Sequence, residues 1–306
     1  MEYVQTSFSI IKPFDLQRNM IAHMTVKSWQ NIPHVAYLYE PDITDFFGLY
    51  KELAANFSQQ GFRLSFNTII MKAIVEGLKA APEMNAHLSY DYLRGKGQIK
   101  ISNTINIGIA WTLPDDRMIT PILFNTQTMD LKAMSQAVAD LDQRISATNI
   151  DELVYQAVKH DTLEEIRKFN PAILKRLFSH LGKIERLRSE EKREYYRIPV
   201  NNRLTPRDLL EATITLSNIG SLYKDLRGSF NVIEIIPPQV AALGIGAVQE
   251  KPGIFQDGQG QSVIGPRKML PINVVFDHRA LDFKAVIPFI RRLDEIFAHP
   301  EEIKSW

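Results

Sequence analysis

Polar residues that suit proton transfer follow one apolar segment near the end of the chain. Residues 270–276 form a mostly apolar run typical of a buried strand, and Asp277, His278 and Arg279 come directly after it. Imidazole titrates near neutral pH, so a histidine held at a strand end suits the role of a general base. Because side chains alternate along a strand, we expect Asp277 and Arg279 to point away from His278 and to be structural. A lone histidine is more often structural, so its assignment depends on its neighbours.

Two further side chains have types that could work with this histidine. Asp282 follows four residues after His278, where a helix is expected to begin, and a lone aspartate at such a place more often caps the helix. Ser217 ends an apolar segment, and by itself it is typical of a structural serine at a strand end. A triad of Ser217, His278 and Asp282 in a thioester hydrolase is one alternative, and it predicts an acyl-serine intermediate.

The segment 277–282 resembles the Asp-His-Arg-x-x-Asp-Gly signature of a known family. That family comprises the catalytic domains of the dihydrolipoamide acyltransferases of 2-oxoacid dehydrogenase complexes, which are relatives of chloramphenicol acetyltransferase. Three more segments resemble the family in order and spacing, namely 18–34, 213–221 and 236–247.

The resemblance covers about residues 7–147 and 204–303. It implies an α+β fold, a two-layer sandwich of a mixed β-sheet with helices like that of chloramphenicol acetyltransferase. It also implies a homotrimer, or a multiple of trimers, with active sites between subunits. The activity it implies is acyl transfer between a coenzyme A thioester and a thiol, small-molecule or carrier acceptor.

The resemblance also assigns roles to individual residues. His278 matches the general base, and Ser217 matches the hydroxyl that donates to the tetrahedral oxyanion. Asp282 matches a residue that pairs with an arginine of the opening helix, for which Arg18 stands at the corresponding position. The remaining candidates, expected beside a substrate channel, are His34, Asn218 and Phe283.

Phe283 departs from the family, because glycine follows the final aspartate of the signature. If that glycine served a positive φ, phenylalanine would cost about 1–2 kcal/mol there. If the glycine only left room, the ring would narrow the channel. An inactive relative, a trimeric scaffold that binds a partner through inserted helices, is therefore the second hypothesis.

Hydrophobic periodicity places these residues on alternating helices and strands. Residues 94–97 predict the turn of a hairpin, and 114–116 the turn between two further strands. Strands that arrive in hairpins favour one mixed sheet covered on one face over a doubly wound parallel sheet. The expected helices are 16–31, 45–60, 67–81 and 129–145, and the expected strands are 35–39, 87–102 as a hairpin, 106–111, 118–123 and 270–276.

Residues 148–203 are expected to be a helical insertion within a single catalytic domain, 1–306. Thr162 and Glu165 have the spacing of a capping box, and Asn170-Pro171 has the order of a cap and a first helical residue, so two helices are predicted. Basic residues separate the apolar ones between 166 and 188. The alternatives are a hairpin packed on its own domain, with a solvated basic face, and a site for a membrane surface or an acidic protein.

Composition restricts the chemistry and the partners. The 306-residue chain has a formal net charge of +1, which gives no general attraction to nucleic acid, and none is expected as a partner. It contains no cysteine, which excludes disulfides and a cysteine nucleophile, and the histidines show no metal-binding spacing. Neither a leader nor a lipoyl-type domain is recognisable. We therefore expect a cytoplasmic protein that meets coenzyme A as an acyl-carrying substrate and any lipoyl group only in trans.

Overall fold

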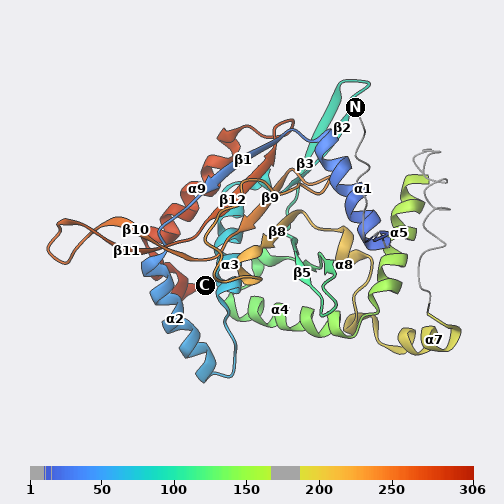
Figure 1. Ribbon diagram of the computed structural model, residues 1–306, viewed down its shortest axis with the longest axis horizontal. Helices are drawn as coiled ribbons and strands as arrows, with labels where there is room; N and C mark the ends of the chain where they lie inside the picture. The colour runs from blue at the N-terminus through green and yellow to red at the C-terminus, as the bar shows by residue number, and fades with distance from the viewer. Residues whose placement is uncertain (1–9, 11, 15, 167–186) are drawn as a thin grey trace, which may run out of the picture.

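A six-stranded mixed sheet forms the centre of the protein in the computed structural model, which describes residues 10, 12–14, 16–166 and 187–306 (Figure 1). Neighbouring strands pair antiparallel except at β9–β8 and β8–β4, which are parallel. The predicted mixed sheet is confirmed. In spatial order the strands are β1 (His34–Tyr39), β12 (Ile272–Asp277), β9 (Ala241–Ile245), β8 (Ile214–Asn218), β4 (Ile107–Ile109) and β7 (Ile122–Leu123).

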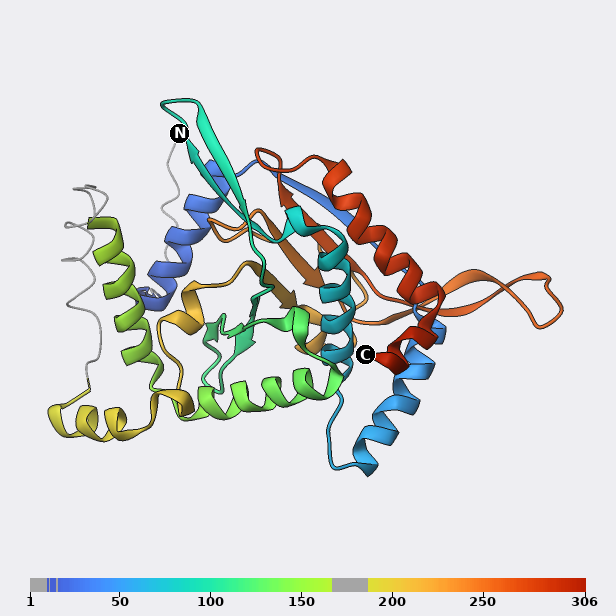
Figure 2. The same cartoon turned by 180° about the vertical axis from the view of Figure 1, so that it is seen from behind.

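Helices cover one face of this sheet and enclose the main core (Figures 1 and 2). Alternate strand residues such as Leu243 and Val274 pack there against Ile74 and Phe289 of the helices. An apolar face of each helix and alternate strand positions thus form one buried layer, as the periodicity predicts. The covering helices are α2 (Thr44–Gln59), α3 (Phe66–Ala80), α4 (Leu131–Ser146) and α9 (Phe283–Ala298), with the short η5 (Pro300–Ser305) after α9.

The opposite face of the sheet is covered differently. A small apolar cluster there joins Val275 and Ala242 of the strands to Ile32 and Ile235. Ile32 directly follows α1 (Leu16–Asn31), and Ile235 belongs to residues 222–238, which form no helix or strand. Residues 222–238 follow the short η4 (Ile219–Ser221) and lead into β9. This segment had no periodicity from which its path could be predicted.

Three two-stranded ribbons stand outside the central sheet. The predicted hairpin is present as β2 (Ala86–Asp91) and β3 (Lys96–Ile101), and β5 (Trp111–Thr112) pairs with β6 (Met118–Ile119) across the predicted turn. The third, β10 (Gln249–Gln256) with β11 (Ser262–Met269), was not predicted, and it projects from the body of the molecule (Figure 1).

The insertion differs from its prediction in one respect. Helix α5 (Ile150–Ile166) runs through Thr162 and Glu165 without a break, so the predicted helix start at Thr162 is wrong. The helix begins earlier because the Asn149 Oδ1 accepts from the Glu152 amide at 2.9 Å. A Thr-x-x-Glu pair acts as a cap only where the preceding turn is absent.

The second predicted helix, at Asn170-Pro171, and most of the basic series lie outside the described residues. After them the chain forms α7 (Ser189–Arg197), which α5 holds through a buried carboxylate. Glu152 accepts from the Tyr196 hydroxyl at 2.6 Å, and the Lys192 ammonium lies 3.6 Å from it. The short elements η3 (Val200–Asn202) and α8 (Arg207–Leu210) lead back to the sheet.

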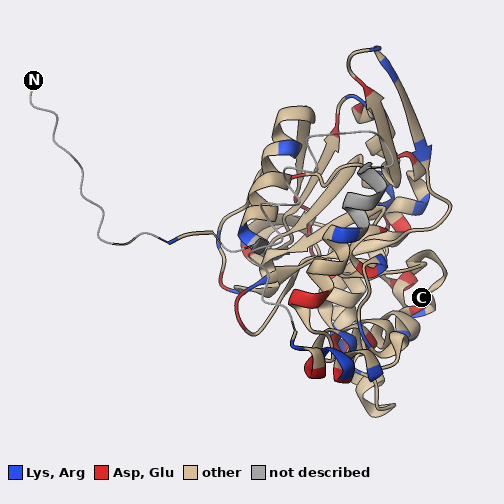
Figure 3. Cartoon of the chain, turned by 90° about the vertical axis from the view of Figure 1, so that its right-hand side faces the viewer, with Lys and Arg blue, Asp and Glu red and all other residues tan. Residues whose placement is uncertain are grey.

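The described surface carries charges of both signs. Figure 3 shows basic and acidic residues interspersed over the described elements. Of the helices that the structure describes, none combines the length and apolar character needed to cross a bilayer. The remaining short elements are η1 (Pro82–Met84) and η2 (Thr126–Thr128).

Candidate active site

His278 directly follows β12, and the backbone fixes its position. Its amide donates to the carbonyl of Pro33, so the residue is held against the junction between α1 and β1. The ring nitrogen Nδ1 lies 3.1 Å from the carbonyl oxygen of Leu281. A carbonyl oxygen can only accept, so Nδ1 carries the proton and Nε2 is left with a lone pair. The side chain is 53% exposed, so the unprotonated Nε2 is accessible and can act as a general base.

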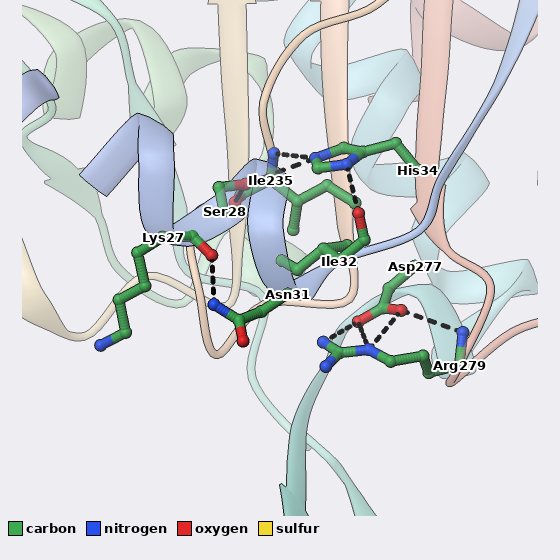
Figure 4. A network of polar contacts seen from close by, with 8 residues as sticks. All are labelled: Lys27, Ser28, Asn31, Ile32, His34, Ile235, Asp277 and Arg279. Carbon is green, nitrogen blue, oxygen red and sulfur yellow. Dashed lines mark hydrogen bonds and ion pairs between the residues drawn. The ribbon is translucent and has the colours of Figure 1, made fainter. Parts of the chain in front are cut away.

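Asp277 and Arg279 form a structural pair next to this histidine (Figure 4). Asp277 is fully buried, and its carboxylate accepts three bonds from the guanidinium of Arg279, at 3.0 and 3.2 Å from Nε and at 2.6 Å from Nη2. It also accepts from the Arg279 amide at 2.9 Å. The pair closes the turn after β12, which agrees with the structural role predicted for both residues.

Asp282 stands at the N-cap position of α9 without capping the helix by a side-chain hydrogen bond. Its Oδ1 lies 3.6 Å from Nδ1 of His278, beyond hydrogen-bonding distance, and its side chain is 85% exposed. The carboxylate is therefore a solvated negative charge on the protonated side of the imidazole. The Leu281 carbonyl, which no side-chain pattern signals in the sequence, makes the direct contact.

Ser217 lies near the end of β8, on the sheet face away from the main core. Its neighbour Leu216 belongs to that core, so the alternation of a strand directs Ser217 to the other side. Within the described residues, the Ser217 hydroxyl makes no hydrogen bond, and the residue is half-buried. A hydroxyl in this condition is free to donate to a ligand.

Ser217 and His278 are far apart within one chain. The register sets Ser217 beside Gly244 and Phe276 beside Ala241, so His278 is level with residue 239, five residues from the level of Ser217. Strands rise about 3.3 Å per residue and lie about 4.8 Å apart, which gives a separation of about 19 Å across two strand spacings. A triad built from one chain is therefore excluded.

His34 joins α1 to the irregular segment over the sheet (Figure 4). Its Nδ1 donates to the Ile32 carbonyl at 2.8 Å, and its Nε2 accepts from the Ile235 amide at 3.2 Å. Ser28 is 1% exposed and donates to the Ile235 carbonyl at 2.7 Å, while the Trp29 ring stacks on the imidazole at 4.7 Å between centroids. Both ring nitrogens of His34 are thus engaged, which favours a structural role over the predicted channel role.

Asn218 points to the helical side of the sheet, away from Ser217. It lines a cavity of about 280 Å³ together with Asn67 and Trp111. Its Nδ2 donates to the Asn67 Oδ1 at 2.9 Å, and its Oδ1 accepts from the Ser221 amide at 3.0 Å. The two adjacent residues of β8 therefore face two different environments.

Phe283 begins α9 without a positive φ, so the strain considered for this position is absent. Its ring packs edge-on against Tyr37 of β1 at 5.2 Å between centroids, and it lies 6.4 Å from Phe276. The Phe276 ring is in turn 6.2 Å from the imidazole of His278. The extra ring thus adds to an aromatic group beside the candidate base.

Arg18 lies exposed in the first turn of α1. His278 contacts the chain just beyond the opposite end of that helix, at Pro33. At 1.5 Å per residue, Arg18 is about 20 Å along the axis from Asn31, which is farther than an arginine side chain reaches. The pairing with Asp282 stays a prediction.

A partly buried hydrogen bond joins α9 to β1, the strand that pairs with β12. The Tyr39 hydroxyl at the end of β1 donates to the Asp294 carboxylate of α9 at 2.6 Å. Burial, and then the bond to Asp294 and its negative charge, raise the pKa of Tyr39 far above its ordinary value. The tyrosine therefore stays protonated and holds α9 on the sheet.

The part of the chain that the structure describes contains no group of three His, Asp or Glu side chains arranged to hold a metal ion.

One protein-family model matches most of the chain. Described as "2-oxoacid dehydrogenases acyltransferase (catalytic domain)", it matches residues 9–154 and 189–304. The unmatched residues 155–188 fall inside the predicted insertion.

Curated relatives carry this family's name. The dihydrolipoyllysine-residue acetyltransferase component of the pyruvate dehydrogenase complex of Mycobacterium tuberculosis is 23% identical over 267 residues, 87% of this chain and 37% of that protein. The corresponding protein of Staphylococcus aureus is 27% identical over 287 residues, 93% of this chain and 50% of that protein. The chain thus spans half or less of the length of these relatives.

Solved structures share the fold. The dihydrolipoamide acetyltransferase of Azotobacter vinelandii matches with a TM-score of 0.66 and 20% identity, covering 99% of this chain and 97% of that one. That structure was studied for the roles of one serine, one histidine and one asparagine in catalysis, the asparagine lying four residues after the histidine. A probable dihydrolipoamide acetyltransferase of Listeria monocytogenes matches with a TM-score of 0.63 and 20% identity, covering 94% and 95% of the two chains.

Proposed function

The chain belongs to the family of 2-oxoacid dehydrogenase acyltransferase catalytic domains, and we propose that it transfers an acyl group between a coenzyme A thioester and a thiol or other small acceptor. The observation that carries this proposal is the state of His278. A backbone carbonyl accepts a hydrogen bond from protonated Nδ1, and the exposed Nε2 is left to accept another proton. General-base catalysis of this kind contributes about 10²- to 10⁴-fold.

The proposed reaction is a direct transfer. Nε2 of His278 removes the proton from the acceptor thiol, and the sulfur attacks the thioester carbonyl carbon. The oxyanion of the tetrahedral intermediate accepts a hydrogen bond from the Ser217 hydroxyl, a contact whose loss costs about 10²- to 10³-fold. The carbon–sulfur bond to coenzyme A then breaks, and its thiolate takes the proton from Nε2. No acyl-serine forms, because the serine only donates a hydrogen bond.

The separation of the two residues requires two copies of the chain for this reaction. Ser217 and His278 lie about 19 Å apart in one chain, so a site that contains both must combine different subunits. A head-to-tail ring supplies such a combination at every interface. Solved neighbours include the cubic core of a pyruvate dehydrogenase complex, which is consistent with a homotrimer or a multiple of trimers here.

Asp282 has a supporting role in this proposal. Its carboxylate lies 3.6 Å from the protonated ring nitrogen, where its charge favours the imidazolium that forms during transfer. In the Azotobacter relative, the histidine studied for its role in catalysis is followed four residues later by an asparagine, which is the spacing of His278 and Asp282 here. An uncharged side chain that can form hydrogen bonds is thus compatible with catalysis at this position. A carried lipoyl group is proposed to enter as the acceptor in trans.

The experiment measures products directly. Acetyl-, propionyl- and butyryl-coenzyme A are incubated with the protein with and without dihydrolipoamide, and free coenzyme A and S-acyl-dihydrolipoamide are quantified by liquid chromatography. We expect the two products in equal amounts, formed only with the acceptor. His278→Ala should reduce the rate at least about 10²-fold. His299→Ala, an exposed histidine at the end of α9, is the matched control and should leave it unchanged.

Two other results would favour the alternatives. If no donor reacts with any acceptor, the protein is a scaffold that keeps the fold without the activity. If coenzyme A is released without acceptor and an acyl-serine is found by mass spectrometry, it is a thioester hydrolase. A normal rate for His278→Ala would remove the proposed base.

A further inference from the structure

A row of three residues crosses the sheet at the level of Ser217, on the face away from the main core. Ser217 on β8 lies beside Gly244 on β9, and Gly244 lies beside Asn273 on β12. Directly opposed residues in a sheet share a face, so all three side-chain positions point to the side away from the main core. The middle position carries no side chain, which leaves a gap about one residue wide next to the serine.

The Phe230 ring fills this gap. A Cβ placed on Gly244 would lie 2.2 Å from Cε2 and 2.4 Å from Cζ of that ring, so the ring rests directly on the strand backbone. A glycine inside a buried strand often marks such a close approach. Neighbouring strands are about 4.8 Å apart, so the ring occupies space immediately beside Ser217.

Hydrogen bonds hold the segment that bears Phe230. The Asn273 Nδ2 donates to the Phe230 carbonyl at 2.8 Å, and the Gln249 Nε2 donates to the Gly228 carbonyl at 2.9 Å. At the other end, His34 and Ser28 bind the amide and the carbonyl of Ile235 (Figure 4). Residues 228–235 are thus fixed at three points, and the ring is a fixed wall despite the lack of helix or strand.

Asn273 holds the Phe230 segment although burying its own side chain is unfavourable. It is 1% exposed, and its Oδ1 has no hydrogen-bond partner in the described structure. A buried polar atom without a partner costs about 1–3 kcal/mol. An apolar residue would avoid that cost at this position but could not bind the Phe230 carbonyl. We take Asn273 as a positioning residue for the wall.

We propose that Phe230 limits the length of the acyl group that can be bound next to Ser217. This inference rests on the proposed role of Ser217 as oxyanion donor. An oxygen bound to that hydroxyl lies about 2.7–3.1 Å from it, and the acyl chain begins on the next carbon. The chain therefore starts within about 5 Å of Ser217, in the space that the ring closes on the Gly244 side.

The experiment compares acyl lengths in variants of Phe230. Turnover is measured with acetyl-, butyryl- and hexanoyl-coenzyme A. Phe230→Ala should raise the ratio of kcat/KM for hexanoyl over acetyl at least about 10-fold, because even one methylene in such a pocket changes specificity about 10- to 200-fold. Phe230→Leu retains more apolar contact, so it serves as the second variant if the alanine variant folds poorly. It should give a smaller rise in the ratio. Val232→Ala, exposed on the same segment, is the matched control and should leave the ratio within about 2-fold.

A binding measurement separates this inference from the proposed reaction. S-ethyl-, S-butyl- and S-hexyl-coenzyme A are thioethers that cannot transfer, and their binding is followed by calorimetry. The ratio compared is the affinity for the hexyl compound over that for the ethyl compound. If wild type shows no turnover but Phe230→Ala raises this ratio at least about 10-fold over wild type, the role of Phe230 is supported and the proposed reaction is contradicted. If that ratio stays within about 2-fold of wild type, or wild type binds none of the three, the inference is overturned.

Discussion

Ser217 and His278 lie at opposite ends of one sheet, with β9 between their strands. The separation of about 19 Å follows from the register alone, because both residues belong to regular strands or directly follow one. Side-chain rotation cannot close such a gap. If both residues serve one reaction, the functional unit is a pair of chains.

Subunit mixing tests this arrangement. His278→Ala and Ser217→Ala chains, each inactive alone, are mixed in equal amounts and allowed to exchange. In a head-to-tail ring, about a quarter of the sites then pair an intact histidine with an intact serine. We expect activity to return to about that fraction of the wild-type rate.

The control for mixing is the double variant. His278→Ala mixed with chains that carry both substitutions has no intact histidine, and it should stay inactive. Exchange is verified by mass spectrometry of the assembled species. If exchange is complete and the first mixture is still inactive, the site is not shared between these two residues.

Asp282 should matter much less than His278. The Leu281 carbonyl already holds the proton on Nδ1, and the Asp282 carboxylate is solvated and 3.6 Å away. We expect Asp282→Ala to lower kcat/KM by less than about 10-fold, and Asp282→Asn by less than Asp282→Ala. Steady-state kinetics measures both. A loss as large as that of His278→Ala would mean that Asp282 takes part in proton transfer.

Asp277 should affect the stability of the fold, in keeping with its structural role. It is fully buried, whereas its partner Arg279 is partly exposed to solvent, with 28% of its side chain accessible. Asp277→Ala removes the acceptor of the Arg279 amide and guanidinium, and hydrogen bonds to a charged group are worth about 1.5–3 kcal/mol, so the free energy of unfolding should fall by about that amount. Urea titration measures it. Glu211→Ala breaks the exposed pair with Arg207 and should change stability by less than about 0.5 kcal/mol. Equal effects of the two substitutions would contradict this account.

Regular elements could be predicted from the sequence because their signals are local. The stripe of apolar residues in α2 and the turn between β2 and β3 need only neighbours along the chain. Local signals also misled at Thr162, where the cap spacing is present but α5 continues from its earlier start at Ile150, capped by Asn149. The spacing of a capping box indicates a helix start only where no helical turn precedes it.

The site could be predicted only in its residue types. His278, Ser217 and the structural pair beside the histidine followed from a strand end and a family resemblance. The Leu281 carbonyl could not be predicted, since every residue has one. Phe230 was also missed, because its contact with Gly244 joins an irregular segment to a strand. The one available signal was a glycine within the buried strand β9.

Asp42 should make stability depend on pH. Its Oδ1 accepts from the Thr44 amide and hydroxyl, at 2.9 and 2.6 Å, and its Oδ2 accepts from the Arg267 guanidinium, which joins the start of α2 to β11. Burial would raise the pKa of Asp42, but the hydrogen bonds from Thr44 and Arg267 outweigh it, and the pKa is lowered below its ordinary value. The folded state therefore favours the ionised carboxylate.

A lowered pKa in the folded state stabilises the protein only where the carboxylate is ionised. The contribution is complete above the unfolded pKa of about 3.9, and it is lost as the pH falls through the folded pKa. Asp42→Asn should therefore reduce the free energy of unfolding by about 1 kcal/mol at pH 7 and by progressively less below about pH 4. Urea titrations of both proteins at pH 7, 5 and 3.5 measure the difference. Asp142→Asn, exposed on α4, should change stability little at each pH. A difference between wild type and Asp42→Asn that grows as the pH falls would show that Asp42 does not stabilise the fold as a carboxylate.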